Sequence, residues 1–124
     1  MSNAIENGRA SFAYEKVSKI SQKGCKQEYR SLVRSFPVMI QTNGFGASIA
    51  FLFSKSKKEA HKALYEDISA WLSKENLINA DLMGAVTRQD RDGYKMMTNE
   101  TMALLLWLKR FAEGMINSET DTKE

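Results

Sequence analysis

The residues that could catalyse a reaction are few and lie far apart in this sequence. His61 is the single histidine and Cys25 the single cysteine, so a His-pair zinc motif is impossible and a structural zinc site is not expected. A nucleophile pair of Cys25 and His61 is conceivable, but neither residue lies in a recognisable catalytic context. We therefore expect the two side chains to be inert.

Two glycine-containing motifs resemble ligand-binding loops but fail in detail. Residues 44–46 read Gly-Phe-Gly, which begins a dinucleotide-binding fingerprint, yet Ile49 stands where the final glycine should be. Residues 90–93 read Asp-Arg-Asp-Gly, and this glycine comes too early for a calcium loop. The sequence therefore predicts a protein that is not an enzyme and that has no metal site and no cofactor.

Lysine side chains form the most regular pattern that could bind a ligand. They recur at helical spacing along the first expected helix and just past it, with Arg9 at the edge of the row and Phe12 within it. A second basic segment follows at Ser54–Lys58. Phosphates along a nucleic-acid backbone suit such rows, and ordinary solvated charge is the alternative. The candidate RNA-binding residues are Arg9, Lys16, Lys19, Lys23, Lys26, Lys55, Lys57 and Lys58.

The net charge of +3 is unevenly distributed along the chain. Residues 1–62 carry eleven Lys and Arg against four Asp and Glu, a balance of +7, whereas residues 63–124 carry seven against eleven, a balance of −4. This asymmetry indicates a basic surface that faces a polyanion and a more acidic surface elsewhere. Ordinary solubilising charge is again the other interpretation.

The elements that position these residues are expected to be helices. The chain has 124 residues and one proline, and it lacks sustained alternation of β-branched residues. We expect an all-α fold, a compact single-domain bundle of about six to seven helices over residues 1–124. The ordered part should run from about 6 to 116, with 117–124 a frayed tail. The lone cysteine and the lack of an apolar leader indicate a cytoplasmic protein.

The longest apolar run, Met102–Leu108, marks the expected centre of this bundle. A helix that is apolar all round for two turns must be surrounded by protein. The run is far shorter than the roughly 20 residues of a membrane span. Thr98 is the expected N-cap of this C-terminal helix, and Glu100 should lie at the positive end of its dipole. Surplus apolar surface on this helix could meet another protein.

Helical spacing of apolar residues predicts the remaining elements. Helices are expected over residues 6–23, 26–36, 45–53 and 57–74, with short ones after Asp81 and near 94–97. The apolar segment 45–53 could be a strand by composition, but nothing else in the chain could pair with it. Pro37 should stop or kink the second helix, with a possible restart to Thr42, and Asn43-Gly44 should break the chain.

Several side-chain positions follow from these helices. Tyr14 and Val38 are expected to face inward, and His61 is expected to face water. The small residues Gly46, Ala47 and Ala50 would allow close approach of a neighbouring helix.

Three groups of residues occur in an order that resembles a known family. In the first, Arg9-Ala10 precedes Tyr14 and Val17. The middle group is Tyr29, Pro37, Asn43-Gly44, Ala50-Phe51 and Ser54-Lys55. The closing group is Tyr94, Thr98, Glu100 and Trp107-Leu108-Lys109-Arg110. Thr101 departs from the pattern, because the family tends to have alanine there. From Arg9 to Gly114 the chain resembles the small all-helical subunit of the type III-B CRISPR RNA-guided effector (RAMP module) complex.

This resemblance implies a non-catalytic structural subunit in antiviral defence. Copies would stack along the complex, beside the subunits that hold the guide RNA, and would help to line the target-RNA path. The implied partners are other effector subunits, further copies of the chain, and guide or target RNA, with no membrane and no small-molecule substrate. From the residues alone, a helical adaptor remains an alternative. A DNA-binding regulator ranks lower, because no helix concentrates Arg, Asn or Gln for reading bases.

Overall fold

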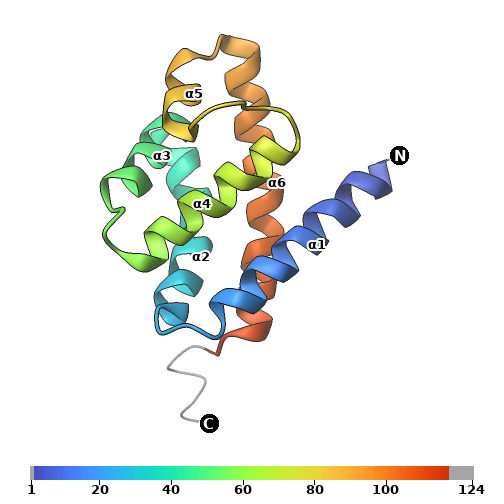
Figure 1. Cartoon of the computed structure of the whole chain (residues 1–124), viewed down its shortest axis with the longest axis vertical. Coiled ribbons are helices and arrows are strands. Elements are labelled where there is room, and N and C mark those ends of the chain that lie inside the picture. The colour runs from blue at the N-terminus through green and yellow to red at the C-terminus, as the bar shows by residue number, and fades with distance from the viewer. Residues whose placement is uncertain (1, 118–124) are drawn as a thin grey trace.

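The computed structural model describes residues 2–117, which fold into six α-helices (Figure 1). The helices are α1 (Ser2–Ile20), α2 (Lys26–Asn43), α3 (Phe45–Ser54), α4 (Glu59–Lys74), α5 (Leu82–Arg88) and α6 (Arg91–Met115). Residues 2–117 contain no strand, so the predicted all-α class is confirmed, and so is the helix at 45–53. From position 118 onward, the predicted frayed tail lies outside the described residues. None of the helices within 2–117 has the length and apolar character needed to cross a bilayer.

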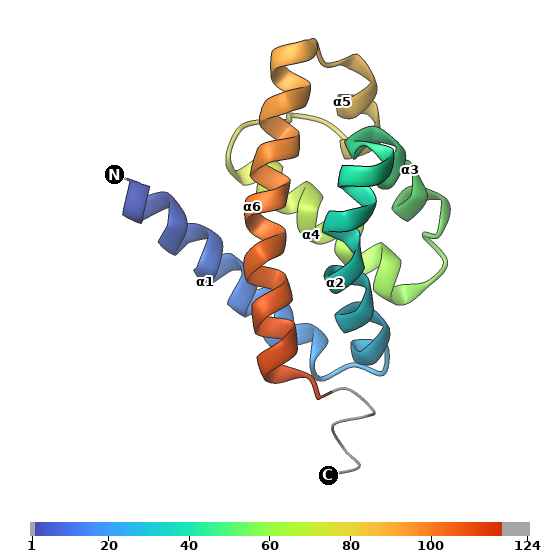
Figure 2. The ribbon, with the colours of Figure 1, turned by 180° about the vertical axis from the view of Figure 1, so that it is seen from behind.

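The long helix α6 is the wall on which the other helices pack. It contacts α1, α2 and α4, and Figure 2 shows it in front, with α1 and α2 on its two sides. Its inner face buries Met97, Thr101, Leu104, Leu105, Leu108 and Ala112. Leu106, in the middle of the apolar run, is 46% exposed. The predicted central helix is therefore confirmed, but the prediction that protein surrounds the run on all sides is wrong.

α6 begins earlier than the sequence predicts. The carboxylate of Asp90 accepts a hydrogen bond of 2.8 Å from the backbone N–H of Gly93 and caps the helix there. Thr98, the predicted N-cap, lies inside α6, where its hydroxyl donates to the carbonyl of Tyr94 (2.8 Å). The separate short helix predicted before Thr98 is thus part of α6. Glu100 consequently lies in the helix interior and not at its positive end.

α2 runs through Pro37 to Asn43, so of the predicted stop or kink with a possible restart, the stop is wrong. Proline lacks the N–H for one helical hydrogen bond, and the burial of Phe36 and Ile40 on the core-facing side offsets that loss. Val38 lies on the opposite side of α2 and is 60% exposed. Its predicted inward position is therefore also wrong.

The predicted break between the second and third helices is confirmed at Gly44. This residue has a φ of +92°, in the region that favours glycine. Beyond it, the backbone N–H of Gly46 donates to the hydroxyl of Tyr94 (2.8 Å), and a Cβ at Gly46 would lie 3.4 Å from that oxygen. The close approach predicted at Gly46 is confirmed, whereas Ala47 and Ala50 are not buried and serve no such contact.

The face of α1 that carries Ala13, Val17 and Ile20 packs on the core as the helical spacing predicts, but Tyr14 does not lie on it. Ala13 and Val17 are fully buried, but Tyr14 is 56% exposed and packs edge-on against the ring of Phe111, with 5.5 Å between ring centroids. The helix ends at Ile20, before the predicted end, and its N-terminal turns extend past α6 (Figures 1 and 2). The predicted inward orientation of Tyr14 is wrong because Ala13 takes the core position next to it.

The polar side chains of Tyr29 and Thr101 are fully buried in the core. The hydroxyl of buried Tyr29 donates to Asp67 (2.7 Å) and so joins α2 to α4. Burial raises the pKa of the Asp67 carboxyl to about 6. Thr101, on α6, is fully buried, and its hydroxyl has no hydrogen-bond partner among residues 2–117. Each of these polar groups carries an energetic cost that an apolar side chain would avoid.

Candidate nucleic-acid interface

The fold brings the two predicted basic segments to one end of the bundle. The turn that follows α1 packs beside the first turns of α4, where Lys23 and Lys62, with the carboxylates of Glu59 and Glu66, line a crevice of about 160 Å³. Lys58, from the connection between α3 and α4, pairs with Glu28 at the start of α2 (3.2 Å). We call this region the basic end. Its cations are Lys16, Lys19, Lys23, Lys26, Lys55, Lys57, Lys58 and Lys62.

The predicted lysine row does not follow a single helix. Lys16 and Lys19 lie on α1, Lys23 lies in the turn after it, and Lys26 begins α2. The ammonium of Lys16 lies over the Phe12 ring, 5.1 Å from its centroid, so the two side chains form a cation–π contact. Because α1 ends early, the row bends toward α4 and so comes close to the second basic segment.

Carboxylates are interspersed with the lysines of the basic end. Glu15 lies 3.8 Å from Lys19, and both side chains are more than half exposed. Glu28 and Lys58 form the closer pair, with side chains 44% and 55% exposed. Exposed ion pairs of this kind contribute little to stability. The lysines can therefore exchange these carboxylates for phosphates at small cost.

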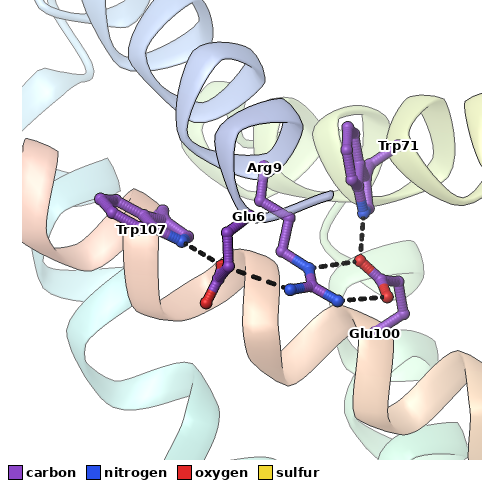
Figure 3. Close-up of polar contacts among 5 residues, drawn as sticks. All are labelled: Glu6, Arg9, Trp71, Glu100 and Trp107. Atoms are coloured by element: carbon purple, nitrogen blue, oxygen red, sulfur yellow. Dashed lines mark hydrogen bonds and ion pairs between the residues drawn. The ribbon is translucent and has the colours of Figure 1, made fainter. Parts of the chain in front are cut away.

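Arg9 is held by a separate network of carboxylates and indoles (Figure 3). Its guanidinium donates hydrogen bonds of 2.7 and 2.9 Å to Glu100 and one of 3.2 Å to Glu6. The indole N–H of Trp71 donates to Glu100 (2.8 Å), and that of Trp107 donates to Glu6 (3.0 Å). The network therefore joins α1 to both α4 and α6.

The two central members of this network are largely shielded from water. The side chains of Arg9 and Glu100 are only 16% and 13% exposed. The hydrogen bonds from Arg9 hold the pKa of the Glu100 carboxyl below its usual range, so the pair is ionised at neutral pH. A two-point contact between guanidinium and carboxylate also fixes orientation. The structure thus gives Arg9 a contact that holds helices together, and we expect RNA contacts from the lysines instead.

Comparison with known proteins identifies the family of this chain. The sequence pattern of the CRISPR-associated protein family Cas_Cmr5 matches residues 5–115. The chain belongs to the Cmr5 family. One relative, the CRISPR system Cmr subunit Cmr5 of Thermus thermophilus, is 35% identical over 104 residues, which are 84% of this chain and 89% of the relative. The crystal structure of a CRISPR-associated Cmr5 family protein from the same organism matches with a TM-score of 0.77 at 31% identity, covering 90% of this chain and 99% of that one.

Membership of the Cmr5 family confirms the resemblance found in the sequence. That resemblance was to the small all-helical subunit of the type III-B effector, and it covered nearly the same part of the chain as the family match. The shared fold extends over almost the whole of the related crystal structure. The chain is accordingly a subunit of a type III-B CRISPR effector.

Cys25 and His61 have no arrangement typical of catalysis in this Cmr5 chain. Burial raises the pKa of the Cys25 thiol, and a protonated thiol is a poor nucleophile. His61 was predicted to face water, but it is only 7% exposed and packs against Phe51. Its Nδ1 has no hydrogen-bond partner among residues 2–117 and lies 3.9 Å from Glu28. Within the same residues, no group of three His, Cys, Asp or Glu could hold a metal ion.

Sequence reasoning missed one cation of the basic end. Lys62 lies on α4 one turn after Lys58 and shares the crevice with Lys23. Its spacing of four residues from Lys58 was visible, because side chains four apart lie on one side of a helix. Its proximity to Lys23 depends on the packing of α1 beside α4, which spacing cannot show.

Proposed function

We propose that this Cmr5-family chain is a non-catalytic structural subunit of the type III-B CRISPR ribonucleoprotein effector in antiviral defence. Copies of it stack along the complex with the other subunits, and the basic end helps to line the path of the target RNA. The observation that carries the proposal is the convergence at one end of the fold of the lysines that follow α1 and those that precede α4.

The chemistry of the basic end supports contact with an RNA backbone. Lysine ammonium groups neutralise phosphates but read no base, so such contacts position a strand without selecting its sequence. A subunit that lines the path of many different targets needs that property. The exposed ion pairs with Glu15 and Glu28 leave the lysines able to move to phosphates.

Fluorescence anisotropy of labelled single-stranded RNA, measured over a range of salt concentrations, tests the RNA contact. The test variant combines Lys19→Gln, Lys23→Gln and Lys57→Gln. Each lost phosphate contact on a single strand should reduce the slope of log K against log salt by about 0.7, so the triple variant should lose about 2. The matched control removes three exposed cations elsewhere, by Arg88→Gln, Arg91→Gln and Lys95→Gln.

Three results would contradict the proposal. Equal losses in the test and control variants would mean that net charge, and not the basic end, governs binding. Purification from the native host tests the assembly: recovery with larger proteins and a protected small RNA supports it, whereas recovery alone and free of RNA contradicts it. Tight, sequence-specific binding to duplex DNA would favour a regulator instead.

A further inference from the structure

A polar pocket lies between α2 and α6, two helices that pack against each other and run side by side in Figure 2. It has a volume of about 340 Å³ and is lined by Ser31, Arg34, Ser35 and Lys109. Within residues 2–117, the one carboxylate within ion-pair distance of either cation is that of Glu113, 3.2 Å from Nε of Arg34. The pocket therefore offers two cations and two hydroxyl groups against a single carboxylate.

Cations and hydroxyl groups of this kind can bind a phosphate. A guanidinium presents several N–H donors in a planar fork, an ammonium adds a point charge, and the Ser31 hydroxyl can donate to a further oxygen, whereas the Ser35 hydroxyl donates to the carbonyl of Leu32 (3.3 Å). The side chains of Arg34 and Glu113 are 55% and 36% exposed, so their ion pair is weak. An incoming phosphate can share the guanidinium with Glu113 or replace it.

An aromatic cluster lies on the opposite side of the same part of α6. The ring of Tyr14 on α1 meets Phe111 edge-on at 5.5 Å, and Phe111 lies 5.7 Å from Trp107, both measured between ring centroids. Tyr14 is 56% exposed, so part of its ring is open to a ligand. The pocket side chain Lys109 and the cluster side chain Phe111 are separated in sequence by Arg110, which is exposed. A strand that crosses α6 would therefore meet the pocket, a cation and the aromatic cluster in turn.

We propose that the C-terminal half of α6, with its neighbours on α1 and α2, is a binding site for single-stranded RNA. The pocket of Arg34 and Lys109 holds a backbone phosphate, and a nearby base stacks on Tyr14. The inference rests on the proposed function for the identity of the nucleic acid, and it adds a surface separate from the basic end. Stacking on an aromatic ring is tolerant of base identity, as is a phosphate contact.

The test uses the full chain and labelled single-stranded RNA of mixed sequence, about 20 nucleotides long, in the anisotropy assay over a range of salt. Arg34→Gln with Lys109→Gln should reduce the salt slope by about 0.7, the value for one phosphate. Tyr14→Ala should weaken binding about fivefold or more at every salt concentration without changing the slope, since a stacked base contributes at least about 1 kcal/mol.

Matched controls separate these effects from charge and folding. Arg88→Gln with Lys95→Gln removes two cations elsewhere and should cost less affinity than the pocket variant. Tyr14→Phe keeps an aromatic ring and should bind like the unmodified chain. Thermal unfolding of every variant checks that the fold is intact.

Three outcomes would overturn the inference. If the pocket and Tyr14 variants bind normally while the basic-end triple variant does not, this site is wrong and the proposed function stands. If inorganic phosphate, added at constant ionic strength, displaces RNA from the unmodified chain but not from the pocket variant, and Tyr14→Ala has no effect, the pocket is a simple anion site. If the unmodified chain fails to bind RNA both alone and within the purified effector, the proposed RNA contact fails with it.

Discussion

The carboxyl of Asp67 should make the folded chain less stable as the pH rises. Burial raises its pKa from 3.8 to about 6, so over that range the folded chain holds a proton that the unfolded chain has lost. The resulting stabilisation is fully present below pH 3.8 and is lost as the pH rises through about 6. At 1.36 kcal/mol per tenfold change, the whole loss is about 3 kcal/mol, and about 2 kcal/mol of it falls between pH 4.5 and 7.5.

Asp67→Asn isolates this effect from other titrating groups. Asparagine still offers an acceptor to the Tyr29 hydroxyl but cannot ionise, so it should be more stable than the unmodified chain by about 3 kcal/mol at pH 7.5 and about 1 kcal/mol at pH 4.5. Urea unfolding at the two pH values measures both differences. The range stops at pH 4.5 because Glu100, whose pKa Arg9 lowers, loses its own stabilising contribution below that value. Asp92→Asn, which removes an exposed carboxylate from α6, is the control and should keep the slope of the unmodified chain.

Tyr29→Phe tests the cause of the raised pKa of Asp67 by removing its hydrogen-bond donor. The Tyr29 hydroxyl donates to the ionised carboxylate and thereby lowers its pKa, although burial outweighs this effect. Removing the donor should therefore move the titration midpoint above 6. The reasoning is refuted if the advantage of Asp67→Asn is the same at both pH values, or if it is larger at the lower one.

Three further predictions concern stability at neutral pH. Glu100→Gln should lower the free energy of unfolding by about 2 kcal/mol and the thermal midpoint by roughly 8 °C, because an uncharged amide then faces the shielded guanidinium of Arg9. The control Glu6→Gln, at the exposed edge of the network, should leave the midpoint nearly unchanged. Thr101→Val should raise the free energy of unfolding in urea by about 1 kcal/mol, because a methyl group replaces a buried hydroxyl that has no partner among residues 2–117. A loss of stability would contradict this explanation. Asp90→Ala should lower the free energy of unfolding by about 1 kcal/mol, because it removes the N-cap of α6. Thr98→Ala should lower it clearly less. If the two losses came in the reverse order, the helix start predicted from the sequence would be right.

The inner faces of α2 and α4 are predictable because each helix has one apolar stripe. On α4, Leu64, Ile68 and Trp71 follow helical spacing and are all buried. The same reasoning holds for Tyr29 and Phe36 on α2. For these five residues the local pattern and the tertiary packing agree, whereas Val38 on α2 and His61 on α4 are exceptions.

The spacing of residues does not predict burial or a helix start where the sequence allows more than one choice. α1 carries apolar residues on several sides, and nothing in the sequence chooses between Ala13 and Tyr14 for the core. At the start of α6, both Asp90 and Thr98 are good capping residues, and the burial of Met97 within a continuous helix favours Asp90. These choices are made by packing between elements, which a single sequence does not display.

At the candidate site, too, local patterns are visible in the sequence, whereas contacts between distant segments are not. Both lysine segments are visible in the sequence because each is local. The pairing of Arg9 with Glu100 spans 91 positions, and it gives a structural contact to the one arginine that the sequence grouped with the lysines. The pocket of Arg34 and Lys109 is also invisible in sequence, since its cations come from two helices.

The structure therefore separates the residues that hold the frame from those that could meet RNA, and this separation can itself be tested. Glu100 and its partners lie inside the contacts of α1, α4 and α6, while the lysines of the basic end are mostly exposed. Variants of the network should lower the thermal midpoint and leave the salt slope of RNA binding unchanged. Variants of the basic end should lower the salt slope of RNA binding and leave the thermal midpoint unchanged. If one class of variant changed both quantities together, the frame and the RNA surface would be coupled, and the small subunit would have to be treated as a mobile part of the effector and not as a rigid one.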